Sequence, residues 1–409
     1  MSEQKTPTTI MKDWGSGDSV FMMVFYPFGS RNEHPEQRGG MHVLEHMVFQ
    51  GVDHADLQSW ADITQQFEPM GRINAMTSHN FVGYWCHVAH DRANEAAASL
   101  GHLATCSPLL PPSSHKSEIE VVVRELEEAY DNPSQRSMEE ASVTMHGADD
   151  PMGWSIGATP DQVRSLTKDT LLELYAASHS RPRAIVLGKN VTEAYDILFD
   201  ILRKKLAGGQ SYRDMVPDRA PTILAPSERL IDSDTKGYHL VLSQVYPAIH
   251  LGDHDYYVAC IVAKILGSRM GSRLTRKGRE NGLVYSVSAS VEADADCARL
   301  VIVTSVQRKE DVDTLVSYIR DPPTETDVEQ TKQWVAAQRK LAVSTSPMAV
   351  ADEIVDFLRF RRDLMRDRGY EWEDESKKYQ SVTAEEVGAF WKQFLVDGAF
   401  YRTIVGKST

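Results

Sequence analysis

Two histidines and a glutamate lie close together in the segment His42-Val-Leu-Glu45-His46. If this segment is helical, positions four residues apart share one face, so both imidazoles can reach a single metal ion. The Glu45 carboxylate leans toward the same side, where it can accept a proton from a metal-bound water and later release it. This order of residues is the inverse of H-E-x-x-H and occurs as a metallopeptidase signature. The alternative is a chance arrangement of two ordinary histidines, so other residues must support the interpretation.

A catalytic zinc ion needs a third protein ligand and an open position. The segment from Ser117 to Tyr130 has the pattern of a helix and is rich in glutamate. Glu118 and Glu125 are seven residues apart, which places them on one helix face about 10.5 Å apart along the axis. One carboxylate can bind the metal while the other orients a ligand from behind. The residues alone do not show which glutamate binds the metal and which supports a ligand. The alternative is that the glutamates form only the solvent-exposed face of an ordinary helix.

The elements that must position these side chains follow a similar order in the two halves of the chain. β-Branched and aromatic runs predict strands, and apolar residues at helical spacing predict helices. In the first half the predicted strands are 20–28, 72–77, 81–88 and 183–188, and the predicted helices are 41–51, 91–106, 117–130, one opening near 159, and 191–206. In the second half the predicted strands are 238–246, 284–292, 298–306 and 400–406, with a helix at 255–267 and three later helical stretches.

This order predicts an α+β fold of two similar tandem domains, each an antiparallel sheet with helices packed on one face. The chain has 409 residues, which is too long for one core, because single cores stop growing near about 250–300 residues. A stretch rich in Gly and Pro marks the boundary. We therefore expect an N-terminal metal-binding domain at 1–207, a linker at 208–228, and a C-terminal domain without the metal motif at 229–409.

Composition excludes several classes of function. The formal net charge of −14 argues against nucleic-acid binding, which uses a basic stripe. No apolar run approaches the ~20 residues that cross a bilayer, so we expect no membrane association. The N-terminus has no apolar segment typical of a secretory signal, which predicts a cytoplasmic location. The four cysteines have no metal-binding spacing and are expected to be reduced.

The chain resembles the pitrilysin (insulinase) family of inverted-motif zinc metallopeptidases, and is similar to its bacterial short-chain and mitochondrial processing peptidase-like members. The resemblance rests on HVLEH, on EIEVVVRE ending at Glu125, and on RINAMTS from Arg72 to Ser78. It extends to GATP ending at Pro160, the Leu166-Thr167 helix start, and Arg181-Pro182.

The resemblance implies roles for particular residues of this chain. His42, His46 and Glu125 would bind one Zn²⁺ per chain, with Glu118 as the supporting acid. Glu45 would be the general base and acid. Asn74 and Ala75 would contact the substrate backbone at a sheet edge, where peptide adds as a strand.

In the second half, the resemblance implies that Tyr285 and an arginine reach the substrate and stabilise the oxyanion. Arg279 is the first candidate and Arg276 the other, because the family's pair is usually seven residues apart and Arg279 stands six before Tyr285. A partner chain could supply the pair instead.

We therefore expect a zinc-dependent endopeptidase acting on peptides or unfolded segments, assembled as a homodimer or as a heterodimer with a related subunit. The first alternative is a non-catalytic or partner-dependent peptide-binding subunit of a heterodimeric processing peptidase. The second is a zinc enzyme with a non-peptide substrate.

Overall fold

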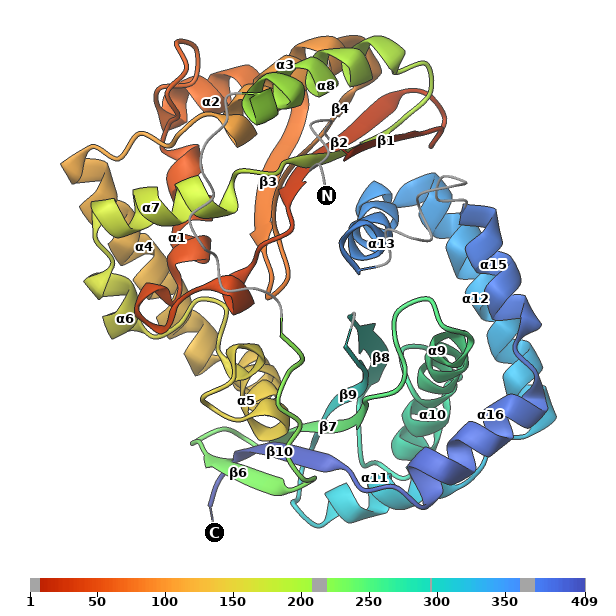
Figure 1. The fold of residues 1–409 in the computed structure, drawn as a ribbon. Helices are drawn as coiled ribbons and strands as arrows, with labels where there is room; N and C mark the ends of the chain where they lie inside the picture. Colours follow the sequence, from red (N-terminus) through yellow and green to blue (C-terminus); the bar gives the residue numbers. More distant parts are fainter. Residues whose placement is uncertain (1–7, 208–218, 295, 361–371, 409) are drawn as a thin grey trace. The chain divides into compact units, whose positions relative to one another are not determined.

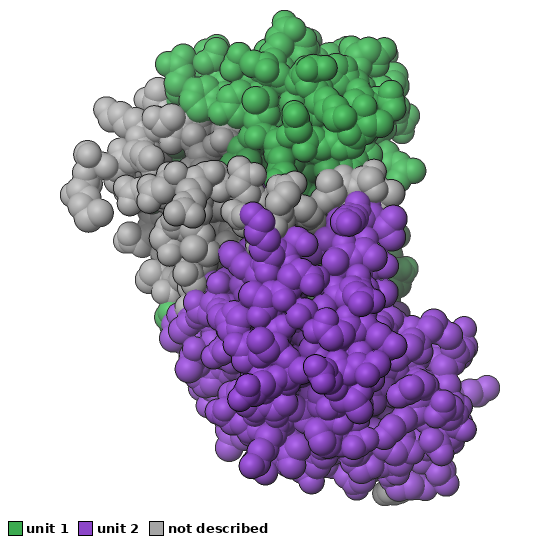
Figure 2. Space-filling view, turned by 90° about the vertical axis from the view of Figure 1, so that its right-hand side faces the viewer, with its two compact units in different colours: residues 1–128, 154–219, 342–352 green, residues 129–153, 220–341, 353–409 purple. Residues whose placement is uncertain are grey.

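The computed structural model describes residues 8–207, 219–294, 296–360 and 372–408, and these form two compact units. Unit 1 comprises residues 1–128, 154–219 and 342–352, and unit 2 comprises residues 129–153, 220–341 and 353–409. Figure 2 shows the two units in different colours. Both units therefore contain residues from both halves of the chain.

Unit 1 is built on a five-stranded sheet in the order β1-β5-β2-β4-β3. Its strands are β1 (Thr8–Lys12), β2 (Ser19–Tyr26), β3 (Gly71–Thr77), β4 (Val82–Ala89) and β5 (Arg183–Leu187). All neighbouring strands are antiparallel except β1 and β5, which are parallel. Because β3 is the last strand in this order and pairs with β4 along one side, its other side is an edge of the sheet.

Helices pack against the sheet of unit 1 and enclose its main apolar core (Figure 1). They include α1 (Gly40–Phe49), α3 (Ala93–Thr105), α7 (Lys168–Ser178) and α8 (Thr192–Ala207). Alternate residues of β2, from Val20 to Tyr26, are fully buried in this core, as the two-residue period of a strand requires. The shorter helices are α2 (Trp60–Phe67) and α6 (Pro160–Ser165), and α4 (Pro112–Asp131) runs in this unit as far as Glu128.

Unit 2 repeats the sheet topology with the order β6-β10-β7-β9-β8. Its strands are β6 (Glu228–Asp232), β7 (Tyr238–Tyr246), β8 (Val287–Ala293), β9 (Ala298–Val306) and β10 (Tyr401–Gly406), and β6 runs parallel to β10. Its helices include α9 (His254–Leu266), α10 (Arg273–Glu280), α11 (Asp311–Arg320), α15 (Trp372–Ser381) and α16 (Ala384–Phe390), with a π-helical turn at Trp391–Val396. Helix α12 (Glu325–Thr345) belongs to this unit as far as Leu341, and α13 (Pro347–Phe360) belongs to it from Glu353 onward. A second core lies between this sheet and its helices.

The predicted α+β fold of two similar domains is confirmed. Each sheet is antiparallel apart from one parallel pair, which the sequence analysis did not include because β1 and β6 are short strands at the sheet margins. Helix α5 (Pro133–His146) was not predicted either, and it packs on β7 and β10 within unit 2. Of the predicted linker, residues 208–218 lie outside the described residues, and 219–227 contain no helix or strand.

The four cysteines form no disulfide among the described residues, and Cys86, Cys260 and Cys297 are buried. No helix within the described ranges is both long and apolar enough to cross a bilayer.

Candidate metal centre

Helix α1 presents the two histidines of the inverted motif. It follows Gly39, which has a left-handed backbone (φ 81°), and its apolar side chains, including Met41, Leu44 and Met47, are buried in the core of unit 1. The period of 3.6 residues therefore turns the intervening polar positions away from that core. The rings of His42 and His46 lie with their centroids 4.9 Å apart and nearly perpendicular, at 88°.

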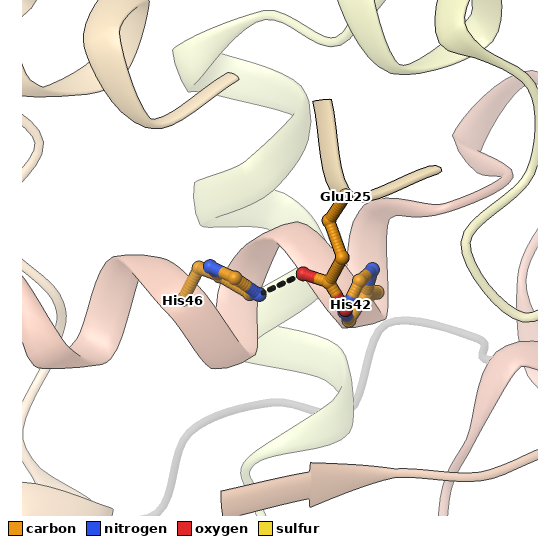
Figure 3. Close-up of side chains that lie close together, drawn as sticks. All are labelled: His42, His46 and Glu125. Atoms are coloured by element: carbon orange, nitrogen blue, oxygen red, sulfur yellow. Dashed lines mark ion pairs between the residues drawn. The ribbon is translucent and has the colours of Figure 1, made fainter. Parts of the chain in front are cut away.

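The third side chain of the cluster comes from α4. Glu125 places one carboxylate oxygen 3.7 Å from Nε2 of His42 and the other 3.3 Å from Nε2 of His46 (Figure 3). One ligand atom from each residue can be chosen so that all three lie within 4.8 Å of one another. The Glu125 side chain is 54% exposed, so this side of the cluster is open to solvent.

The donor set fits a zinc ion. Zinc binds imidazole nitrogen and carboxylate oxygen at about 2.0–2.2 Å, and tetrahedral geometry then sets neighbouring ligand atoms about 3.3 Å apart. The two nitrogen–oxygen separations of 3.7 and 3.3 Å run to different oxygens of Glu125, and one ligand atom from each of the three residues lies within 4.8 Å of the others. Three protein ligands with an open side correspond to a catalytic rather than a structural site.

Glu118 lies behind His46 rather than beside both imidazoles. One of its oxygens is 3.0 Å from Nδ1 of His46, and the other accepts a hydrogen bond of 2.7 Å from the side-chain amide of Gln50. A carboxylate in this position fixes the tautomer and the orientation of the ring. Gln50 was not among the predicted site residues, although its spacing of four residues from His46 places both on one face of α1.

The Glu45 carboxylate is held by the edge strand of the sheet. The hydroxyl of Thr77, the last residue of β3, donates a hydrogen bond of 2.6 Å to Oε2 of Glu45. Burial raises the pKa of the Glu45 carboxyl, while the Thr77 hydrogen bond lowers it. Thr77 belongs to the R-I-N-A-M-T-S segment singled out in the sequence, but this contact was not foreseen, because sequence alone does not show which side chain it meets.

The protonation states of the two imidazoles differ in the metal-free protein. Burial and the neighbouring His46 lower the pKa of His42 to about 4. For His46, burial lowers the pKa, but hydrogen bonds to Glu118 and Glu125 outweigh it and raise the pKa to about 9. The hydrogen bond to His46 also lowers the pKa of Glu125. A metal ion binding here must therefore displace a proton from His46.

A cavity of about 510 Å³ opens next to His46 and Glu45. Its other lining residues are mainly apolar or aromatic, and they come from α1, α2, β3 and α4: Phe49, Gln50, Trp60, Ile63, Thr64, Ile73, Asn74, Glu118 and Val121. The Trp60 side chain is 53% exposed. The cavity can therefore take an apolar group that enters from solvent.

Asn74 and Ala75 lie on β3, beside the cluster. Asn74 is exposed, lines the cavity, and its side-chain oxygen accepts a hydrogen bond from the backbone N–H of Ala75. Because β3 is an edge strand, its backbone can pair with an extended peptide.

The residues singled out in the second half belong to unit 2. Arg279 lies on α10, and its guanidinium is 4.9 Å from the ring centroid of Tyr285. The Tyr285 side chain is 79% exposed, and Arg276 is also exposed. The structure therefore pairs Tyr285 with Arg279.

Comparison with protein families identifies the family to which the chain belongs. A model described as Insulinase (Peptidase family M16) matches residues 10–156, and one described as Peptidase M16 inactive domain matches residues 165–333. The chain therefore belongs to the insulinase family of peptidases, family M16.

Individual relatives have low sequence identity to this chain, but the similarity extends over most of both chains. An uncharacterized zinc protease of Bacillus subtilis, YmxG, is 25% identical over 338 residues, which is 80% of each chain. A probable mitochondrial-processing peptidase subunit beta of Schizosaccharomyces pombe is 23% identical over 86% of this chain and 81% of the relative. Among solved structures, a peptidase M16 inactive domain from Pseudomonas fluorescens has a TM-score of 0.83 at 17% identity, covering 100% of this chain and 97% of that one. A protease from Helicobacter pylori has a TM-score of 0.81 at 15% identity, with 99% and 98% coverage.

Proposed function

We propose that this chain is a zinc-dependent endopeptidase that cleaves peptides or unfolded segments. The observation that carries the proposal is the convergence of His42, His46 and Glu125 beside a held carboxylate, Glu45, and the edge of a sheet. When bound, a zinc ion supplies Lewis-acid polarisation of water and of the scissile carbonyl.

The chain's own residues would carry the remaining steps. An extended peptide would pair with the backbone of β3 near Asn74 and Ala75, which binds substrate with little demand on its sequence. Glu45, oriented by Thr77, would take the proton from the attacking water and deliver it to the departing amine nitrogen. Tyr285 is the proposed oxyanion donor, and Arg279 is proposed to contact substrate with it.

The cavity beside His46 suggests a preference in the substrate. Its lining by Phe49, Trp60 and Ile63 favours an apolar or aromatic side chain next to the scissile bond. We therefore propose that cleavage is fastest at bonds flanked by such residues, and that the peptide must be unfolded, because only an extended backbone can pair with β3.

The proposed assembly is a dimer, either of identical chains or with a related subunit, and the proposed location is the cytoplasm. The relative named as a processing-peptidase beta subunit makes a heterodimer the alternative to test. In that case this chain would be a partner-dependent peptide-binding subunit, although all four motif side chains are present in it.

The deciding experiment measures zinc content and cleavage of a mixed peptide library by the purified chain, with wild type beside Glu45→Gln. One zinc per chain, with cleavage lost in the variant, supports a self-sufficient peptidase. Bound zinc without cleavage by wild type indicates a missing partner. A wild-type chain that binds no zinc overturns the proposal.

A further inference from the structure

Glu33 is a fully buried carboxylate outside the metal cluster, with a side chain only 2% exposed. It lies just after a short helical turn, η1 (Ser30–Asn32). Burial raises the pKa of its carboxyl to about 8, although hydrogen bonds from two backbone N–H groups and the charge of Arg38 lower it. An ionisable group is rarely buried in this way without a specific contact to make.

Both oxygens of Glu33 bind the start of the metal-binding helix. Oε2 accepts a hydrogen bond of 2.9 Å from the N–H of Gly39, and Oε1 accepts one of 2.7 Å from the N–H of Met41. Met41 is the residue directly before the proposed ligand His42. The first N–H groups of a helix have no partner within the helix, and acceptor oxygens such as these satisfy them.

Helix α1 has no capping side chain of its own. Its N-cap residue is Gly39, which offers no side-chain acceptor. Its backbone is left-handed, and an added Cβ would come within 2.7 Å of the Gly157 carbonyl oxygen, so a capping side chain is disfavoured at this position. The Glu33 carboxylate therefore takes the place of the usual N-cap, from six residues upstream.

The same segment is fixed to the turn between β3 and β4. The N–H groups of Ser30 and Arg31 donate hydrogen bonds of 3.0 and 3.2 Å to the carbonyls of Ser78 and His79. Gly29 lies against that turn so closely that an added Cβ would come within 2.3 Å of the Ser78 oxygen. Residues 29–33 therefore connect the end of the edge strand to the first turn of α1.

We infer that Glu33 is a positioning residue that holds the first turn of α1 so that His42 and His46 converge on Glu125 and Glu45 stays on Thr77. This inference rests on the proposed function, because it concerns the same metal centre. Glu33 touches neither metal nor substrate. Its effect is expected on zinc affinity and on kcat, since both depend on where the imidazoles and the Glu45 carboxylate lie.

The test compares wild type with Glu33→Gln, which keeps the size of the side chain but replaces one acceptor oxygen by a donor. The dissociation constant for zinc is measured by competition with a chelator, and kcat and KM with one peptide substrate. We expect zinc affinity to fall about tenfold or more, the range found when groups that orient metal ligands are removed. We also expect kcat to fall at least tenfold while KM changes little.

Two matched variants separate positioning from general effects. Glu36→Gln makes the same change at an exposed site three residues along the chain and should leave zinc affinity unchanged. Leu198→Ala removes most of a buried apolar side chain from α8 in the same unit. It should therefore lower the unfolding temperature of the zinc-free protein without weakening zinc binding.

A Glu33→Gln protein that is folded and binds zinc as tightly as wild type, with the same kcat, overturns the inference. A loss of zinc affinity of equal size in Leu198→Ala also overturns it, because the effect would then be loss of stability alone. If Glu33→Gln does not fold, Glu33→Asp decides by the same measurements, since it keeps the carboxyl group but its shorter side chain cannot reach both N–H groups. A wild-type chain without zinc affinity contradicts the proposed function instead, so the two failures are distinguishable.

Discussion

The two units have the same sheet order but differ in what the helix after the central strand presents. In unit 1, α1 follows the central strand β2 and carries His42, Glu45 and His46; in unit 2, α9 follows the central strand β7 and carries buried Tyr257 and Cys260. The Tyr257 hydroxyl donates a hydrogen bond of 2.7 Å to Glu375 of α15, so α9 uses its polar atoms to join helices.

This difference shows that the metal cluster does not follow from the fold. Sheet order, the parallel marginal pair and a helix after the central strand occur in both units, because each unit must cover an apolar sheet. The chemistry depends on a few side chains that the core does not require. Changing them should therefore alter activity far more than it alters folding.

The largest expected effect comes from removing the ligand that α4 is proposed to contribute. Glu125→Ala should reduce zinc content from one per chain to near zero and abolish cleavage, because only two ligands remain. The matched change on α12 of unit 2, Glu329→Ala, should retain both zinc and activity. Metal analysis and a peptide assay on both proteins check this. Equal zinc in the two variants would contradict the assignment of the centre to unit 1.

The next effect tests whether unit 2 takes part in the chemistry. Tyr285→Phe removes a single hydroxyl from an exposed ring and should leave zinc content and stability unchanged. If the hydroxyl stabilises the oxyanion, kcat should fall about 10²-fold, as when one such donor is lost elsewhere. Steady-state kinetics measure this, and an unchanged kcat would make unit 2 a binding domain only.

A smaller effect is expected from the carboxylate behind His46. Glu118→Gln should weaken zinc binding about 10–100-fold without removing a ligand. Competition with a chelator measures the change. If zinc binding is lost as completely as in Glu125→Ala, Glu118 would itself be a ligand.

The same carboxylate should shape the pH dependence of zinc binding. Zinc must displace the proton of His46, whose pKa in the metal-free protein is raised to about 9 by its hydrogen bonds to Glu118 and Glu125, which outweigh the lowering effect of burial. At pH values below this pKa, zinc affinity should therefore increase as the pH is raised, by up to about tenfold per pH unit. Glu118→Gln should lower the pKa of His46, because it removes one of the groups that hold the proton, so the rise should end at a lower pH than in wild type.

The smallest effect is a loss of stability in acid that originates in unit 1. Burial lowers the pKa of His179 to about 3, and the ring contacts the Tyr84 hydroxyl at 2.9 Å. The unfolded chain binds a proton below its ordinary pKa of about 6.5 while the native ring stays neutral, so stability falls as the pH drops from about 6.5 toward 3. Between pH 7.5 and 5.5 the loss is about 1.4 kcal/mol.

Urea unfolding of the zinc-free protein at these two pH values measures this loss. His179→Gln, which has no proton to gain, should show a pH dependence smaller by about the same amount. An identical pH dependence in wild type and variant would assign the acid sensitivity to other groups.

Several features of this protein could be predicted from its sequence because they depend on local spacing. A four-residue interval on a helix places His42 and His46 on one face whatever surrounds them. Alternating and β-branched runs predicted β2, β4, β7 and β9, because such runs suit a buried strand. The two tandem α+β domains followed from the repeated order of these elements.

Where two residues had equally suitable spacing, only the tertiary structure showed which of them lies at the metal cluster. Glu118 and Glu125 share one face of α4, and which of them meets both imidazoles depends on how α4 crosses α1. The contacts of Thr77 and Glu33 join segments that no periodicity connects. The marginal strands β1 and β6 are defined by the neighbours they pair with, and α5 by the sheet of unit 2 on which it packs. The sequence by itself determined which residue types were available for chemistry, whereas long-range packing decided which of them lie within bonding distance.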